Sequence, residues 1–204
     1  MGSNPTRRIV RILVLGAGGS VGSHVADEAI RRGHDVTGAG REAVRDAGAV
    51  AAAAAGHDVA INAAFDRSRP ESLLEILHTL LAGLEQAGVT RLIVVGGAGT
   101  LEAEPGRLVM DLEDFNPDYR AEAQAHLDAL RVLRSTDTPI DWSVITPPRS
   151  FDDSGRTGSY RTGGGGLLLD DEGRSRISLE DFAVAVLDEA ENPRHSRARF
   201  SVAY

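Results

Sequence analysis

The residues with the clearest chemical meaning form a glycine-rich turn, Gly16-Ala17-Gly18-Gly19-Ser20-Val21-Gly22. An apolar run over residues 9–15 precedes this turn, and a stretch with helical spacing over residues 21–32 follows it. A strand, a glycine turn and a helix start in this order are typical of sites that bind a dinucleotide diphosphate. The predicted phosphate-binding residues are therefore Gly16, Gly18, Gly19, Ser20, Val21 and Gly22.

Each glycine of the turn has a separate physical reason. Gly16 lets the chain turn sharply, Gly18 or Gly19 lets the backbone approach the phosphates, and Gly22 lets the helix pack closely on the sheet. The helix start adds free N–H groups and the positive end of the helix dipole. The alternative interpretation is a tight turn in an α/β protein that binds no ligand.

The composition excludes several kinds of catalysis. All 22 residues counted as Lys or Arg are arginine, and there is no cysteine. Schiff-base chemistry, a P-loop lysine, a Tyr-x-x-x-Lys pair, thiolate catalysis and cysteine-ligated metals are therefore ruled out. The six histidines are scattered without ligand spacing, so we expect no metal site.

Charge and hydropathy limit the partners. The formal net charge of -8 argues against a general affinity for nucleic acid or acidic membranes. The sequence begins without the apolar region of a signal peptide, and no apolar run of about eighteen residues could span a bilayer. We expect a single cytoplasmic domain, residues 1–204, whose partner is a small-molecule acceptor and whose oligomeric state is open.

Predicted strands and helices alternate along the chain. Strands are expected at residues 9–15, 34–41, 58–64, 91–95, 141–145 and 200–202, and helices at 21–32, 42–55, 70–88, 118–134 and 179–190. Ser178 and Asp181 form a predicted capping box for the last helix, and residues 150–166 are expected to be loop or hairpin. This order predicts an α/β fold, a Rossmann-like doubly wound parallel sheet in three layers.

Five segments resemble the atypical short-chain dehydrogenase/reductase superfamily: residues 16–22, 32–36, 95–101, 156–161 and 175–185. The last two resemble the small NmrA-like NAD(P)H-binding proteins, often described as NADH-flavin reductases and related to biliverdin-IXβ reductase. The resemblance implies a nicotinamide cofactor lying across the strand ends. It also implies that residues 146–204 contribute a flap on the substrate side.

The cofactor preference depends on Arg41, which follows the second predicted strand. The resemblance places an arginine for the 2′-phosphate of NADP at this position. A guanidinium complements phosphate, whereas an acidic residue would favour the ribose hydroxyls of NAD. We therefore expect NADP, with NAD as the alternative; a solvated surface arginine is the other interpretation of Arg41.

Two departures from the family pattern bear on function. Only residues 42–56 separate Arg41 from His57, where relatives usually fit another strand and helix, so this unit is shortened and the adenine side is expected to be open. The tyrosine–lysine pair is also missing, because Tyr119 is followed four residues later by Ala123. His126 lies roughly where a lysine would be expected.

Hydride transfer remains feasible without that pair. A nicotinamide can reduce a conjugated acceptor if the pocket stacks the two and excludes water. The residues expected to line the cofactor are Ala63, Ala64 and Phe65 on the ribose–nicotinamide side and Thr146 and Pro147 near the carboxamide.

Two residues are candidates for direct chemistry. Thr100 is a candidate hydrogen-bond donor to the acceptor, or a cap of its own turn. His126 is a candidate proton donor, or simply a partly exposed side chain.

Three arginines flank the glycine-rich segment near the carboxyl terminus: Arg149, Arg156 and Arg161. They either clamp an anionic substrate or are solvated charges on a flap. The predicted function is an NAD(P)H-dependent oxidoreductase that delivers hydride to a flavin or quinone. The alternatives are a non-catalytic nucleotide sensor, or an epimerase or tailoring reductase of a biosynthetic pathway.

Overall fold

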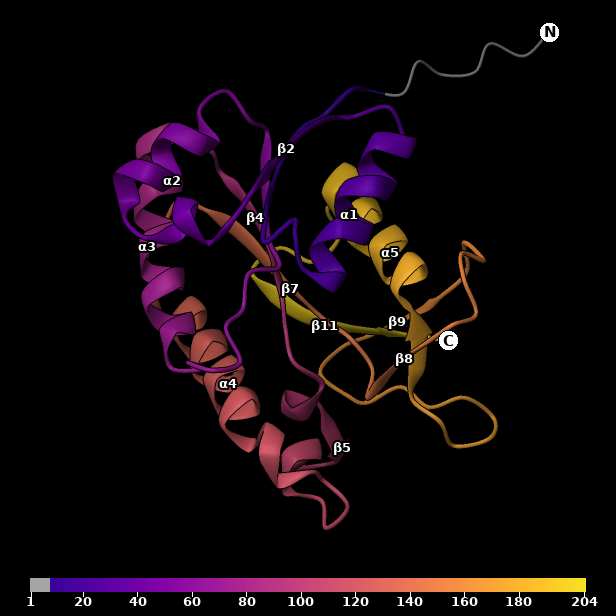
Figure 1. The fold of residues 1–204 in the computed structure, drawn as a ribbon. Coiled ribbons are helices and arrows are strands. Elements are labelled where there is room, and N and C mark those ends of the chain that lie inside the picture. Colours follow the sequence, from indigo (N-terminus) through magenta and orange to yellow (C-terminus); the bar gives the residue numbers. More distant parts are fainter. Residues whose placement is uncertain (1–7) are drawn as a thin grey trace, which may run out of the picture.

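A computed structural model describes residues 8–204 (Figure 1). Its central sheet has seven strands in the order β2-β1-β3-β4-β7-β11-β9. Six of them are parallel, and β9 runs antiparallel to β11. Their bounds are β1 Arg11–Leu15, β2 Asp35–Ala39, β3 Val59–Asn62, β4 Arg91–Val95, β7 Asp141–Thr146, β9 Arg161–Gly163 and β11 Ala198–Ala203.

Helices cover both faces of the sheet, which confirms the three-layer Rossmann-like fold (Figure 1). The helices α1 (Ser20–Arg31) and α5 (Leu179–Glu191) lie on one face. The other face carries α2 (Ala47–Ala54), α3 (Ser72–Ala87) and α4 (Arg120–Ser135). Each face has its own apolar core because the central strands are buried on both sides.

The long leucine-rich helix forms as its periodicity predicts. Leu77, Leu80 and Leu84 of α3 are buried against the sheet, since residues three and four apart share one helix face. The helix ends where Gly88 adopts a left-handed conformation with φ 71°.

The shortened unit after β2 is also observed. The sheet ends at β2, and residues 40–58 contain a 3-10 turn, η1 (Arg41–Val44), and α2 but no further strand. The prediction of one helix over residues 42–55 was wrong. Asp46 interrupts it because its carboxylate accepts a hydrogen bond from the N–H of Ala49 at 2.8 Å and caps α2.

The connections beyond β4 contain elements that the sequence patterns did not predict. They are η2 (Ala98–Thr100), the antiparallel pair β5 (Glu102–Glu104) and β6 (Arg107–Leu108), η3 (Val109–Asp111), and η4 (Pro117–Tyr119).

Residues 150–166 do not form a hairpin, which was one of the two predicted states. The segment contains β8 (Ser150–Asp152), which pairs in parallel with β10 (Arg176–Ser178), whereas β9 joins the main sheet. The segment between β8 and β9 therefore crosses from one small sheet to the edge of the large one.

The predicted capping box of α5 is only half formed. The Ser178 hydroxyl accepts a hydrogen bond from the N–H of Asp181 at 3.0 Å, so the cap itself is confirmed. The Asp181 carboxylate instead accepts hydrogen bonds from the N–H groups of Thr157 and Gly158 and from the Tyr204 hydroxyl. Asp181 therefore holds part of the predicted flap against the helix layer.

Within residues 8–204, no helix combines the length and apolar character needed to cross a membrane. A cytoplasmic location stays a prediction.

Candidate functional site

The candidate site lies at the carboxyl ends of β1 and β3. In the sheet, β1 lies between β2 and β3. Loops that leave two adjacent parallel strands in opposite directions open a crevice between them, which is where such sheets bind ligands.

Gly16 fits this position because its neighbours leave no room for a side chain. Its φ is 81°, and a Cβ atom there would lie 2.7 Å from the backbone nitrogen of Ala64. Its N–H donates to the carbonyl of Ala39 at 2.8 Å. The turn after β1 is therefore held between the ends of β2 and β3.

Gly22 fixes how the first helix meets this turn. A Cβ atom at Gly22 would lie 2.1 Å from the carbonyl oxygen of Gly16, so α1 lies directly against the turn. The N–H of Gly19 donates to the same carbonyl at 2.9 Å.

The outer side of the turn is open and suited to an anion. A Cβ atom at Gly18 would have nothing within 4 Å, and Gly18, Gly19 and Ser20 are exposed. Gly19 caps α1 without a side-chain hydrogen bond, and the first turn of α1 carries no acidic residue. The first N–H groups of the helix are thus left for a ligand, while Val21 packs into the core. These residues fit a dinucleotide diphosphate.

Ala63 and Ala64, the first two residues after β3, lie beside the glycine turn, as the cofactor assignment requires. The N–H of Ala63 donates to the carbonyl of Leu15 at 2.9 Å, and Ala64 contacts Gly16 as described above. The Phe65 ring stacks on His126 with a centroid distance of 4.9 Å. Their contact with a cofactor stays a prediction.

Thr146 and Pro147, at the carboxyl end of β7, are both buried. The Thr146 hydroxyl has no hydrogen-bond partner among the described residues and lies against Gly96, whose Cβ atom would be 2.8 Å from it. A role near the carboxamide stays a prediction for both residues.

Thr100 adopts the turn-capping alternative. The residue is 2% exposed, and its hydroxyl donates to the carbonyl of Gly97 at 2.8 Å. Because the single hydroxyl proton is used within its own turn, the structure does not present it to an acceptor.

His126 is partly exposed, as the second of its two interpretations expects, although its ring is closely packed. Its ring stacks on Phe65, and a Cβ atom at Gly97 would lie 2.7 Å from its Cδ2. Burial lowers the pKa of His126 to about 4. The imidazole is therefore neutral at physiological pH, which favours packing over proton donation.

We expect His126→Gln to leave the pH dependence of any reductase activity unchanged between about pH 6 and 8, because a group with so low a pKa does not titrate there. A proton NMR titration of the His126 ring in the unmodified protein checks the pKa directly. A midpoint near pH 6.5, or an activity limb that disappears in the variant, would contradict this expectation.

The three arginines near the carboxyl terminus have different partners, and the anion clamp stays a prediction for them. Arg149 pairs with Asp114 at 2.8 Å, and Arg156 pairs with Glu28 at 3.1 Å. Arg161 donates to the carbonyl of Leu169 at 2.7 Å. Each guanidinium is used to tie a different segment down.

Arg41 begins η1, close to the turn because Ala39 is bonded to Gly16. Its side chain lies outside the described part of the chain. The 2′-phosphate assignment therefore depends on the backbone position alone.

The sequence patterns did not reveal the buried Glu28 and the arginines around it. Arg31 and Arg32 stand three and four residues after Glu28, which is a readable helix signal. No local pattern predicts the third partner, Arg156.

The chain is similar to known proteins over most of its length. A family model described as NAD(P)H-binding matches residues 41–190. A crystal structure from Burkholderia pseudomallei, of a protein provisionally named as exported, is 38% identical with a TM-score of 0.88; the match covers 96% of this chain and 100% of that one.

Two further crystal structures carry more specific names. A protein from Bacteroides thetaiotaomicron, provisionally named an epimerase, is 32% identical with a TM-score of 0.87 over 97% of this chain and 98% of that one. A protein from Streptococcus pneumoniae TIGR4, provisionally named an NADH-flavin reductase, is 27% identical with a TM-score of 0.83 over 95% and 99% of the two chains.

Proposed function

This chain belongs to the NAD(P)H-binding family of atypical short-chain dehydrogenases/reductases, and on that premise we propose that it is an NAD(P)H-dependent reductase of a small, flat, conjugated acceptor such as a flavin or quinone. The observation that carries the proposal is the glycine turn after β1, closed against Ala64 on its inner side and open at Gly18 on its outer side. The similarity to the Streptococcus pneumoniae protein supports the reductase class.

The chain's own residues bind and orient the cofactor. The first N–H groups of α1 receive the diphosphate, and residues 63–65 and 146–147 flank the nicotinamide end. A bound nicotinamide supplies the hydride, and the protein supplies position and protection from water.

The described candidates for proton transfer favour an acceptor that needs little help from the protein. Thr100 donates within its own turn, and His126 is neutral. The chain has no lysine to form a tyrosine–lysine pair. A flavin or quinone suits such a site because its conjugated rings spread the negative charge and it can take the proton from water.

The lack of a proton donor among these candidates also fits a second function. A protein that binds the dinucleotide but lacks a proton donor is also suited to sensing the nucleotide and regulating a partner. An epimerase would likewise bind the dinucleotide without net consumption, and one similar structure carries that provisional name.

The decisive experiment measures NADPH and NADH binding by calorimetry and then follows oxidation of each with a panel of flavins and quinones. Turnover with at least one acceptor supports the reductase. Tight binding without turnover on any acceptor would point to a sensor or an epimerase. Binding of neither nucleotide would remove all three functions.

We further propose that NADP is the preferred cofactor, held through Arg41. Arg41→Ala is expected to lower the ratio of NADPH to NADH affinity at least about 10-fold, because a charge-assisted contact to a phosphate contributes about 1.5–3 kcal/mol. The measurement is the pair of dissociation constants.

Arg45→Ala is the matched control for Arg41→Ala. Arg45 lies at the other end of η1, and its side chain is 70% exposed. The control is expected to keep the preference of the unmodified protein. An equal NADPH preference in Arg41→Ala and in the unmodified chain would defeat the 2′-phosphate assignment.

A further inference from the structure

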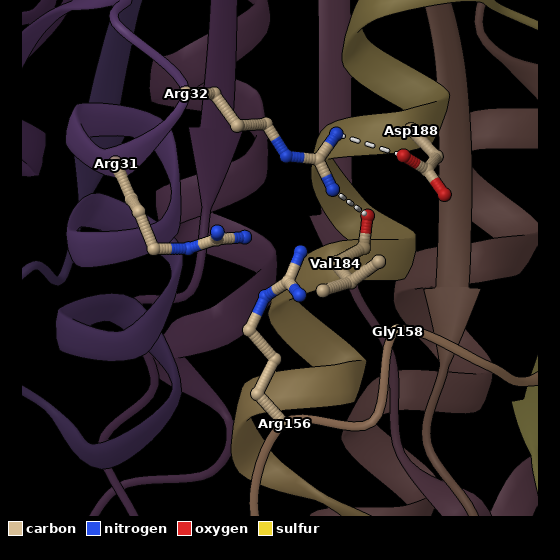
Figure 2. A pocket seen from close by; sticks show the side chains of 6 residues that line it. All are labelled: Arg31, Arg32, Arg156, Gly158, Val184 and Asp188. Carbon is tan, nitrogen blue, oxygen red and sulfur yellow. Dashed lines mark hydrogen bonds and ion pairs between the residues drawn. The ribbon is translucent and has the colours of Figure 1, made fainter.

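A cavity lined by three arginines and one aspartate lies away from the glycine turn, between α1, α5 and residues 156–158 (Figure 2). Its volume is about 380 Å³. The residues that line it are Arg31, Arg32, Arg156, Gly158, Val184 and Asp188. Figure 2 shows the guanidinium groups of Arg31 and Arg156 pointing toward each other across the opening.

One buried carboxylate holds all three arginines. Glu28 is 5% exposed and accepts hydrogen bonds from Nε of Arg31 at 2.8 Å and Nε of Arg32 at 2.7 Å. Nε of Arg156 reaches the same carboxylate at 3.1 Å. A single negative charge is thus shared among three positive ones.

Two further acidic residues contact the cluster on the side of Arg32. Asp188 and Glu191 both pair with Arg32, at 2.7 and 3.2 Å. Arg31 and Arg156 have Glu28 as their carboxylate partner among the described residues. Three guanidiniums are therefore matched by three carboxylates, but two of these carboxylates lie at Arg32, and the half-exposed Arg31 and Arg156 share Glu28 as their ion-pair partner.

Both guanidiniums also keep a donor available. Nε and Nη2 of Arg31 and of Arg156 bind Glu28, whereas Nη1 of each makes no hydrogen bond to a described residue. Two arginines that line one cavity and each keep a free N–H donor can bind an anion together.

This cavity is separate from the predicted diphosphate site. Arg31 stands eleven residues after Ser20 in the same helix, which is roughly 16 Å along its axis. A single small anion cannot reach both places.

We propose that this cavity is a second anion site, which binds inorganic phosphate or the phosphate group of a small phosphomonoester through Arg31 and Arg156. The two free Nη1 donors contact the phosphate oxygens, and the cavity leaves room beyond the phosphate for a small organic group. Because Arg156 belongs to the segment between β8 and β9, the bound anion ties that segment more firmly to α1.

The test titrates the protein with inorganic phosphate against chloride at equal ionic strength and follows the arginine Nε–H signals by NMR. Saturable shifts of the Arg31 and Arg156 signals are expected. Arg31→Gln and Arg156→Gln are each expected to weaken phosphate binding at this site at least about 10-fold, since each removes one of two charged donors.

Arg131→Gln is the matched control, because Arg131 on α4 pairs with Asp128 three residues earlier just as Arg31 pairs with Glu28. It is expected to bind phosphate like the unmodified protein. If a glutamine variant fails to fold, Arg31→Lys and Arg156→Lys keep the charge but lose the fork and are expected to weaken binding several-fold.

If phosphate binds only at the glycine turn, both glutamine variants would bind phosphate with the affinity of the unmodified protein. That result, or the lack of saturable shifts at Arg31 and Arg156 in the unmodified chain, would overturn the second site. Neither outcome depends on whether the protein binds a dinucleotide.

Discussion

Gly22→Ala is expected to destabilise the protein by about 3 kcal/mol and to abolish dinucleotide binding. The added Cβ atom would lie 2.1 Å from the carbonyl oxygen of Gly16, and a backbone atom cannot move aside without displacing the whole turn. Denaturant unfolding and calorimetry with NADPH measure the two effects.

Gly18→Ala is the companion variant that separates folding from binding. Its Cβ atom would have nothing within 4 Å, so the free energy of unfolding is expected to change by no more than about 0.5 kcal/mol. NADPH affinity is nevertheless expected to fall about 10-fold, because the methyl group would stand where the diphosphate approaches the backbone. Unchanged affinity in Gly18→Ala would show that the open side of the turn is not the phosphate site.

Glu28→Ala is expected to lower the free energy of unfolding by about 3 kcal/mol. The substitution leaves Arg32, which is 5% exposed at its side chain, without one of its carboxylate partners and releases two further guanidiniums. Glu75→Ala is the control, since Glu75 lies on a helix with its side chain 76% exposed, and it is expected to cost no more than about 0.5 kcal/mol. Equal effects of the two substitutions would contradict the assigned role of Glu28.

The same carboxylate predicts a pH dependence. Burial alone would raise the pKa of Glu28, but the hydrogen bonds from three guanidiniums outweigh it and lower the pKa to about 2 from 4.5. A carboxylate with a depressed pKa stabilises the folded state above its unfolded value, so this contribution, about 3 kcal/mol at most, is lost as the pH falls from 4.5 toward 2. Glu28→Gln is expected to flatten that part of the stability profile.

The parts of the fold that follow from local chemistry could be predicted from the sequence. The glycine turn is one example, because Gly16 and Gly22 meet contacts that no other residue tolerates. The leucine spacing of α3 and its terminal Gly88 are another, since periodicity and a left-handed cap act within one segment.

The remaining features depend on contacts between distant segments. The strands β8 and β9 pair with β10 and β11, so their partners lie beyond the reach of any local pattern. The pairing of Arg156 with Glu28 crosses more than half of the chain.

The roles of the side chains at the site could not be predicted either, because they depend on the packing around each side chain. Thr100 has a hydroxyl group that can donate a hydrogen bond, but it donates to the carbonyl of Gly97 within η2 and its flanking turn. His126 has an imidazole that can donate a proton, but burial beside Phe65 and Gly97 lowers its pKa and keeps the ring neutral.

The two margins of the central sheet have a consequence for how these molecules meet one another. The outer strand β2 has five residues, begins with Asp35 and contains Gly38, and the opposite outer strand β9 has three residues, including Arg161 (Figure 1). Short strands with charges and glycine are poor templates for a neighbour's backbone. The sheet therefore exposes no long apolar border along which copies could aggregate.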